Sequence, residues 1–355
     1  MQSTDNFDFI IQWHLTERCN LRCSHCYQGD ARGRELSLTE VLAGVAELSD
    51  LFAAWTSSYG LSFSPSFSVT GGEPLLRPDL LDVLRGITSR GYEAFLLTNG
   101  TLIDAGQALM LRDADVTGVQ VSIEGPEDIH DRIRGRGSYA ASLRGIEQLV
   151  DVGMPVTMNA TLSTMNAQQF MALLPVASSL GVQRLGFSRL VPSGRGAGLV
   201  DAMLSRAQVR QVYDSVRAAQ TGALALVSGD PLFGQMGTDA TPEADNSVPR
   251  GGCAAGVSGL TILADGTLVP CRRLPIPIGN ITRDAVRDVW SSSPVLESLR
   301  DRSRYHGACG ECTRWSGCRG CRAIAYAYER SRGVDDLLAD DPQCFLGAAT
   351  EGEGR

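Results

Sequence analysis

The first 200 residues of this chain alternate short apolar runs with longer amphipathic stretches. The apolar runs have the length of β-strands, and the longer stretches have the spacing of helices with one buried face. We expect strands at residues 9–15, 66–70, 94–98, 118–123, 155–162 and 184–190. We expect helices at residues 39–51, 79–89, 104–112, 139–152 and 167–180.

A strand followed by a helix, repeated along the chain, predicts an α/β fold with a parallel sheet covered by helices. Six such units fit a partial, open (β/α)6 TIM-like barrel over residues 1–205. Ser37 and Glu40 form a capping-box pattern at the start of the first predicted helix. In such sheets ligands gather at the carboxyl ends of the strands, so we look there for chemistry.

The rest of the chain has a different pattern. Residues 202–220 predict a helix and residues 223–227 a short strand. Residues 234–252 are rich in Gly, Pro, Asp and Asn, so we interpret 206–249 as a bridging helix and loop. Residues 250–355 then form a cysteine-rich domain, in which residues 259–263 and 267–270 predict a β-hairpin.

Composition and charge narrow the class of protein. The chain has 355 residues, 43% of them hydrophobic, a net charge of −8 and a pI near 5.1. It has no arginine-rich or lysine-rich tract, which disfavours nucleic acid as a partner, although local basic patches near Arg184, Arg189 and Arg195, or near Arg272 and Arg273, are left open. No apolar run reaches about 18 residues, so we expect no membrane span. Residues 2–6 are polar and lack a signal-peptide pattern, so we expect a cytoplasmic protein.

Ten cysteines dominate the candidate chemistry. Cys19, Cys23 and Cys26 follow the first predicted strand as C-x3-C-x2-C, and the other seven lie between Cys253 and Cys344. Thiolates are suitable ligands for iron–sulfur clusters, and a 4Fe–4S cluster takes four ligands. Three cysteines therefore leave one iron open for a cofactor or substrate. A zinc site lacking one ligand and three unrelated core cysteines are the alternatives, and the position directly after a strand disfavours both.

The first cysteine loop resembles that of the radical SAM enzymes, whose pattern is C-x3-C-x-aromatic-C, with His25 in the aromatic place. The resemblance implies that Cys19, Cys23 and Cys26 are the catalytic cluster ligands and that S-adenosylmethionine binds the open iron. An electron, delivered by a flavodoxin- or ferredoxin-type donor, then yields a 5′-deoxyadenosyl radical that takes a hydrogen atom from the substrate.

The same resemblance assigns cofactor contacts at the strand ends. Gly71, Gly72 and Glu73 match the motif that holds the amino group of the cofactor, and a tight turn is the alternative interpretation. The remaining cofactor-binding positions are His25, Ser122 near the ribose, Arg134 near the carboxylate, Asn159 on the fifth strand, and Leu190 against adenine.

Several of these residues and a nearby loop also have a structural interpretation. A surface ion pair is the alternative for Arg134, and we expect His130 to be a polar loop residue. For the glycine-rich loop 194–198, a plain linker turn and a functional loop are equally favoured. No general acid or base is assigned. Tyr305, His306, Glu124 and Asp230 are candidates for which a structural role is favoured.

The seven C-terminal cysteines resemble the SPASM extension, which carries two auxiliary iron–sulfur clusters. The resemblance assigns Cys253, Cys271 and Cys321 to the nearer cluster and the remaining four to the outer one, namely Cys309, Cys312, Cys318 and Cys344. Three 4Fe–4S clusters then use all ten cysteines. A zinc ribbon is the alternative, but its cysteine pairs are about 15–20 residues apart, and here five residues intervene. The last pair is C-x2-C where the common pattern has three intervening residues, so the ligand set of the nearer cluster is less defined.

The substrate is the least constrained prediction. Anaerobic sulfatase-maturing enzymes carry an aspartate base directly after the second SPASM cysteine, and Arg272 occupies that place here. Residues 9–28 resemble maturases of ribosomally made peptides, in particular the selenobiotic or thio(seleno)oxazole group, which implies a precursor peptide and an oxidative crosslink or ring. Because the first strand begins at residue 9, we expect a separate leader-peptide-binding protein or a different surface to recognise the leader. A small-molecule dehydrogenase, decarboxylase or tetrapyrrole side-chain oxidase is the second hypothesis, and a non-catalytic iron–sulfur or zinc scaffold is the third.

Overall fold

The fold is a single ten-stranded sheet curved into a partial barrel. The computed structural model describes residues 6–29, 33–236 and 246–346. The strand order is β10-β9-β8-β1-β2-β3-β4-β5-β6-β7; the strands from β8 through β1 to β7 are parallel to one another, whereas β9 is antiparallel to both β8 and β10. The strands are β1 (Asn6–His14), β2 (Ser62–Thr70), β3 (Glu93–Thr98), β4 (Gly118–Ser122), β5 (Val156–Leu162), β6 (Arg184–Arg189), β7 (Ala225–Val227), β8 (Gly259–Ile262), β9 (Thr267–Val269) and β10 (Gly279–Asn280).

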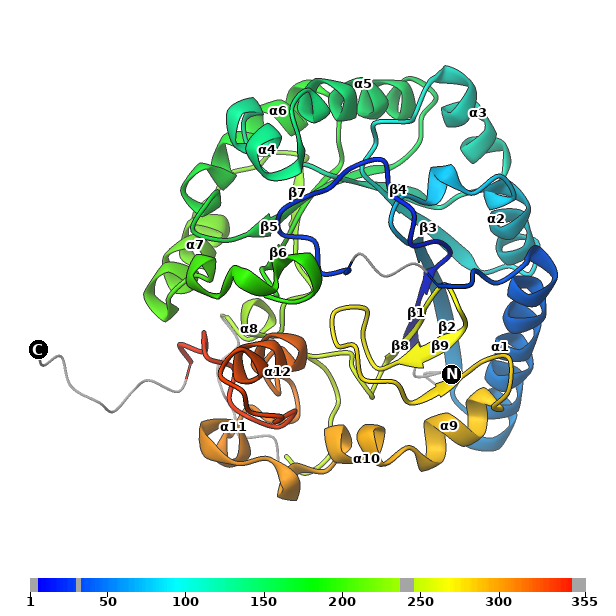
Figure 1. The fold of residues 1–355 in the computed structure, drawn as a ribbon, viewed down its shortest axis with the longest axis vertical. Helices are drawn as coiled ribbons and strands as arrows, with labels where there is room; N and C mark the ends of the chain where they lie inside the picture. The colour runs from blue at the N-terminus through cyan, green and yellow to red at the C-terminus, as the bar shows by residue number, and fades with distance from the viewer. Residues whose placement is uncertain (1–5, 30–32, 237–245, 347–355) are drawn as a thin grey trace, which may run out of the picture.

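Helices cover the outside of the sheet. Figure 1 shows α1 to α7 as an arc around the strands, with the C-terminal helices filling the remaining side of the ring. The helices of the arc are α1 (Leu38–Tyr59), α2 (Leu80–Thr88), α3 (Ala105–Asp113), α4 (Glu127–Arg134), α5 (Ser138–Asp151), α6 (Leu173–Ser179) and α7 (Arg206–Ala218). The later helices are α8 (Pro231–Gly234), α9 (Val286–Ser292), α10 (Pro294–Arg300), α11 (Gly307–Glu311) and α12 (Arg322–Ser331).

Short 3-10 helices complete the secondary structure. They are η1 (Pro74–Leu76), η2 (Ala167–Ala172), η3 (Gly194–Gly198), η4 (Val200–Ala202) and η5 (Arg302–Arg304). Of the helices in the described ranges, none has both the length and the apolar character that crossing a membrane requires.

The predicted α/β barrel is confirmed. All six predicted strands are present, and the Ser37–Glu40 capping box starts α1 as expected. Helix α4 was not predicted, because its eight residues are mostly charged and only Ile129 and Ile133 mark a buried face. The predicted helix 167–180 divides into η2 and α6, where Pro175 has no N–H to donate to the preceding turn.

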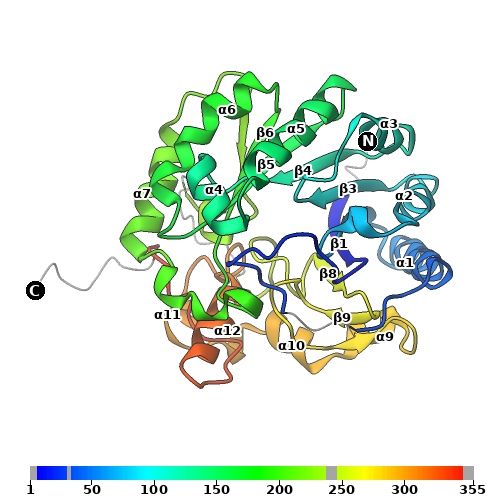
Figure 2. The same cartoon turned by 45° about the horizontal axis from the view of Figure 1, so that its top comes forward.

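The C-terminal segment joins the same sheet. Strand β8 pairs with β1 in parallel over Ile10–Trp13 and Gly259–Ile262, and the predicted hairpin is β8 with β9. Trp290 of α9 packs edge-on against Phe9 of β1, with ring centroids 5.0 Å apart. Figures 1 and 2 show α9 to α12 gathered on the side of the barrel opposite α3 and α5.

Parts of two predicted regions lie outside the described residues. Residues 237–245 belong to the predicted bridging loop, and residues 347–355 belong to the predicted C-terminal domain. Residues 1–5, which include most of the polar start of the chain, are also outside. The division at residues 205 and 249 stays a prediction.

Candidate functional site

The three-cysteine loop begins where β1 ends and lies against the loop after β2. Backbone N–H groups of Gly72 and Glu73 donate to the carbonyls of Thr16 and Arg18, each at 2.7 Å. A Cβ on Gly71 would lie 2.4 Å from the Thr16 carbonyl oxygen, and one on Gly72 would lie 2.3 Å from that of Arg18. Both glycines are therefore required for the two loops to meet.

Glu73 ties this contact to the next strand. Its buried carboxylate accepts hydrogen bonds from Thr98 Oγ1 at 2.8 Å, the Asn99 N–H at 2.9 Å and the Leu75 N–H at 3.1 Å. Burial raises the pKa of Glu73 above its ordinary value, although these hydrogen bonds oppose the rise. Glu73 is not among the residues that line the cavity above the loop, so its side chain holds the loops in place.

The opposite side of the cysteine loop rests on η3. The Gly196 N–H donates to the Cys26 carbonyl and the Arg195 N–H to the Gln28 carbonyl, both at 3.0 Å. Gly194 has a φ of +57°, and a Cβ there would lie 2.2 Å from the Tyr27 carbonyl oxygen. The glycine-rich loop therefore supports the cysteine loop through its backbone, so it is more than a plain linker turn.

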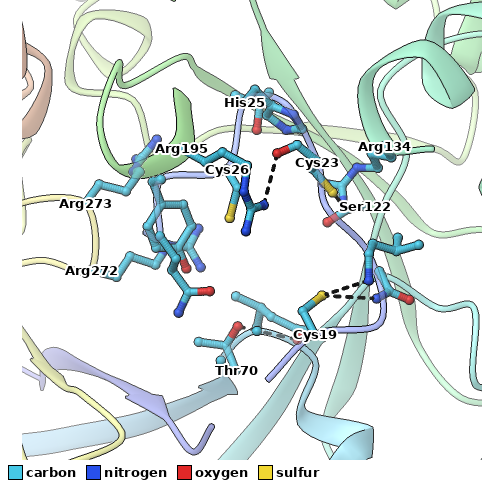
Figure 3. A pocket seen from close by; sticks show the side chains of 18 of the residues that line it. Cys19, Cys23, His25, Cys26, Thr70, Ser122, Arg134, Arg195, Arg272 and Arg273 are labelled. Atoms are coloured by element: carbon cyan, nitrogen blue, oxygen red, sulfur yellow. Dashed lines mark hydrogen bonds between the residues drawn. The ribbon is translucent and has the colours of Figure 1, made fainter. Parts of the chain in front are cut away.

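A cavity of about 1070 Å³, counted with its open mouth, lies at the carboxyl ends of the strands. The predicted residues that line it are Cys19, Cys23, His25, Cys26, Gly71, Gly72, Ser122, Arg134 and Asn159. Figure 3 shows the three cysteine side chains around its centre, with Ser122 and Arg134 along one side. Leu190 is buried and does not line the cavity, whereas Val191, the next residue, does.

Glu124 organises the charges beneath this side of the cavity. Its fully buried carboxylate lies 2.6 Å from Arg134 Nη2 and 3.3 Å from His25 Nε2, and it accepts the Thr161 N–H at 2.8 Å. Burial alone would raise the pKa of Glu124, but Arg134 and His25 hold it well below its ordinary range. The Arg134 side chain is 12% exposed, so this is a buried ion pair and the surface-pair alternative is wrong.

Arg134 also reaches the cysteine loop. Its Nη1 lies 3.9 Å from Cys23 Sγ, while Nε and Nη2 both donate to Glu124. Only one edge of the guanidinium is therefore directed at the cavity.

His130 is buried in α4, so the prediction of a polar loop residue is wrong. Its Nδ1 accepts the Glu124 N–H at 3.2 Å. Burial, together with nearby Arg134, lowers its pKa to about 4. None of the four candidate acids and bases lines the cavity. Glu124 lies beneath it, as described above. Tyr305 donates to the Leu299 carbonyl, His306 pairs with Asp336, and Asp230 pairs with Arg189.

Three arginines of the two sequence-level basic patches line the same cavity. They are Arg195, Arg272 and Arg273, and Figure 3 shows Arg272 and Arg273 entering from the side opposite Ser122 and Arg134. The sequence signal was the Arg272-Arg273 pair directly after Cys271, but its meeting with the N-terminal loop depends on the closed fold. Tyr27 and Gln28, which belong to the stretch that resembles peptide maturases, also line the cavity, as does Thr161, which carried no sequence signal.

Arg189 does not join that group, because it is fully buried between the barrel and the C-terminal segment. It lies 2.7 Å from Asp230 and 2.8 Å from Asp341, and it donates to Gln343 at 3.0 Å. Asp341 in turn accepts the N–H of Cys321 at 2.9 Å. Strand β6, which ends at Arg189, is thus fixed to the cysteine-rich loops.

The four cysteines assigned to an outer cluster surround a second cavity of about 1150 Å³, and they are Cys309, Cys312, Cys318 and Cys344. Backbone N–H groups of Arg314 and Gly320 point at Cys312 Sγ and Cys318 Sγ, both at 3.4 Å. Burial raises the pKa of Cys318 to about 12, so a cationic group is needed to hold it as a thiolate. Four sulfurs around a cavity, with N–H donors to sulfur, fit an iron–sulfur cluster.

Cys253, Cys271 and Cys321 form the remaining group. Cys271 packs in one apolar cluster with Cys321 and in another with Cys253. Among the described residues, no three His, Cys, Asp or Glu side chains converge on the position of a single metal ion. The assignment of Cys253, Cys271 and Cys321 to a cluster therefore stays a prediction.

Two family models match the chain. Residues 13–174 match the radical SAM superfamily, and residues 253–314 match an iron–sulfur cluster-binding domain, SPASM. An AdoMet-dependent heme synthase of Methanosarcina barkeri is 31% identical, with 97% of this chain and 98% of that protein covered. An Fe-coproporphyrin III synthase of the same organism is 32% identical, covering 95% and 88%.

Two further comparisons concern a maturase and a solved structure. The mycofactocin maturase MftC of Mycolicibacterium smegmatis is 29% identical, with 95% of this chain and 82% of that protein covered. Streptococcus suis SuiB bound to S-adenosylmethionine has a TM-score of 0.75 and 18% identity, covering 96% of this chain and 78% of that one. At that identity the likeness concerns the fold.

Proposed function

The chain belongs to the radical SAM superfamily and carries a SPASM domain, and on that premise we propose that it oxidises a carboxylate-bearing side chain of a tetrapyrrole. One observation carries the proposal for the chemistry: the three cysteines of the first loop line one cavity with the ends of the parallel strands. When bound, the cluster and S-adenosylmethionine supply a 5′-deoxyadenosyl radical that takes a hydrogen atom from the substrate.

The residues of this chain have distinct parts in the proposal. Cys19, Cys23 and Cys26 hold the cluster and leave one iron open. The backbone of Gly71 and Gly72, together with the side chains of Ser122 and Asn159, borders the space for the cofactor. Arg134 directs Nη1, which lies 3.9 Å from Cys23 Sγ, at the cofactor carboxylate, since its Nε and Nη2 donate to Glu124. Val191 replaces Leu190 as the apolar contact for adenine, because Val191 lines the cavity.

The C-terminal cysteines would hold groups that could accept the second electron. A substrate that has lost a hydrogen atom becomes a stable product by losing one more electron, and cluster potentials span roughly −700 to +450 mV. We assign Cys253, Cys271 and Cys321 to the nearer cluster and the four cysteines of the second cavity to the outer one. Three clusters of four irons require about twelve irons per chain.

The substrate class rests on the relatives and on the arginines. The heme synthase and the Fe-coproporphyrin III synthase match nearly the whole chain, and their names indicate tetrapyrrole products. Arg195, Arg272 and Arg273 give the cavity a cationic wall that suits carboxylate side chains. This is the second of the hypotheses drawn from the sequence.

A precursor peptide is the second candidate substrate. It is favoured by the resemblance of residues 9–28 to peptide maturases and by the match to a mycofactocin maturase. In that case an oxidative crosslink or ring is the product, and a separate leader-binding protein stays a prediction. A flavodoxin- or ferredoxin-type electron donor is proposed for either substrate.

The test uses anaerobically purified protein, a reductant and S-adenosylmethionine. We expect about twelve irons per chain and formation of 5′-deoxyadenosine. Iron coproporphyrin III should lose mass in step with cofactor cleavage. Replacing Cys23 with alanine should abolish cleavage, and unchanged cleavage in that variant would contradict the proposed site. Turnover of a precursor peptide with no turnover of the tetrapyrrole would favour the second candidate.

A further inference from the structure

Arg272 and Arg273 are two cations at one wall of the cavity without a carboxylate partner in the described part of the chain. Neither forms an ion pair there, whereas Arg189, close by, is neutralised by Asp230 and Asp341. Arg273 donates from Nη1 to the Arg189 carbonyl at 3.3 Å, and its buried Nε has no partner. Both residues are partly buried, and partial burial of a cation without an opposite charge is unfavourable, so an anionic occupant is expected.

The two side chains are held in place from below. The Arg272 guanidinium lies over the ring of Tyr27, 5.7 Å from its centroid. The Tyr27 hydroxyl contacts His14 Nε2 at 3.3 Å, and the other ring nitrogen of His14 contacts Gln28 Nε2 at 2.9 Å. Tyr27 follows Cys26 directly, so Arg272 stacks on the same loop that carries the first three cysteines.

Arg272 and Arg273 lie between the first cysteine loop and Cys271, which is assigned to the nearer auxiliary cluster. Arg272 and Arg273 follow Cys271 in the chain and enter the cavity from the side opposite Ser122 and Arg134. A carboxylate held by these arginines places the rest of its molecule over the first cysteine loop. The same carboxylate then lies close to the cysteine assigned to the nearer auxiliary cluster.

We propose that Arg272 and Arg273 form a carboxylate subsite that anchors the substrate between the first cysteine loop and Cys271. The inference rests on the proposed function, since it requires a substrate that carries carboxylates. Two adjacent guanidinium groups bind a carboxylate through paired, charge-assisted hydrogen bonds. The alternative is that the arginines only balance the negative charge of the cysteine thiolates near Arg273.

The experiment measures binding of two tetrapyrroles to the cluster-loaded protein by anaerobic absorbance titration. One probe is iron coproporphyrin III, and the other is its tetra-amide, which has a similar shape and no carboxylates. Wild-type protein should bind the acid more tightly than the amide. Arg272→Gln and Arg273→Gln should each weaken binding of the acid by about 10–100-fold, the equivalent of one charged hydrogen bond. Neither variant should change binding of the amide.

Arg287→Gln is the matched control, because Arg287 lies in the same segment and its side chain is 72% exposed. It should bind both probes as the wild type does. Equal binding of acid and amide by the wild type, or unchanged binding of the acid by both cavity variants, would overturn the subsite and favour a charge-balancing role. If the wild type binds neither probe, the proposed tetrapyrrole substrate fails together with the subsite, whereas lack of 5′-deoxyadenosine would count against the radical chemistry itself.

Discussion

At the scale of single residues, burial sets the protonation of the groups behind the cavity. His130 accepts a hydrogen bond from the Glu124 N–H and is fully enclosed, so its neutral form is required in the folded protein. Its pKa is lowered from 6.5 to about 4, first by burial and then by Arg134. In the unfolded chain the same histidine is protonated below pH 6.5 or so. Between these two values the unfolded state binds more protons, and acidification favours it.

We therefore predict that His130→Asn reduces the acid sensitivity of the protein. The asparagine side-chain oxygen can accept the same N–H, and it does not titrate. The stability contributed by neutral His130 is fully present above about pH 6.5 and is lost as the pH falls toward 4, by about 2 kcal/mol at pH 5. Anaerobic urea unfolding from pH 5 to 8 measures the difference between variant and wild type. If the unfolding free energies of variant and wild type differ by the same amount at every pH from 5 to 8, His130 does not titrate in this way.

The cavity wall was largely predictable residue by residue, with two instructive exceptions. Cysteines and glycines directly after strands mark this edge of the sheet, and the family resemblance added Ser122, Asn159 and Arg134, all of which line the cavity. Glu73 is satisfied by groups of η1 and the loop after β3 and does not line the cavity, a contact between loops that the pattern of one loop cannot reveal. Leu190 was one residue away from the lining position, because alternation at the end of a strand does not fix which side chain faces the cavity.

At the scale of elements, η3 supports the first cysteine loop. We therefore predict that adding one methyl group to η3, in Gly194→Ala, disturbs that loop. In Gly194→Ala the new Cβ meets the Tyr27 carbonyl at 2.2 Å, in a backbone conformation with φ of +57° that alanine rarely adopts. Such strain costs about 1–3 kcal/mol before the clash is counted. The loop must shift to relieve it, so the variant should contain about four fewer irons and form little 5′-deoxyadenosine.

Gly198→Ala is the matched control for that prediction. Gly198 ends the same 3-10 helix, and a Cβ there has no atom within 4 Å. Its iron content and its cofactor cleavage should match those of the wild type. Equal iron in Gly194→Ala and Gly198→Ala would show that η3 does not hold the loop.

The sequence predicted the helices and strands better than it predicted the contacts between them. The strands were predictable because each is a short apolar run, and the capping box marked the start of α1 correctly. Strand β8 was expected within a hairpin, but its parallel pairing with β1 was not, since nothing local to residues 259–262 specifies a partner about 250 positions earlier. The role of η3 could not be predicted for the same reason, because η3 supports the cysteine loop through backbone contacts with residues 25–28, which are distant in the sequence.

At the scale of the whole molecule, the C-terminal segment and the barrel share one core and one sheet. Strand β8 extends the sheet beyond β1, and the apolar side chains of β8, β9 and α9 belong to the same core cluster as those of β1 to β6. The cavity is completed only by this closure, because Arg272 and Arg273 come from the C-terminal segment and the first three cysteines from the N-terminal loop. Closure of the ring therefore brings Arg272 and Arg273 to the same cavity as the first cysteine loop.

Buried polar contacts of Arg189 also hold the C-terminal segment against the barrel. Breaking them should therefore affect the C-terminal cysteines. Asp341 lies 2.8 Å from Arg189 and accepts the N–H groups of Cys321 at 2.9 Å and Gln343 at 3.0 Å. Asp341→Asn keeps the shape but leaves part of the charge on Arg189 uncompensated, and breaking a buried pair costs about 3–5 kcal/mol. We expect a lower urea midpoint and about four to eight fewer irons, because Cys321 and the nearby Cys344 lose their support. Asp288→Asn, at a side chain that is 68% exposed and 3.5 Å from Arg287, should change stability by less than about 1 kcal/mol. Full iron content together with an unchanged midpoint in Asp341→Asn would mean that the apolar core alone holds the C-terminal segment against the barrel.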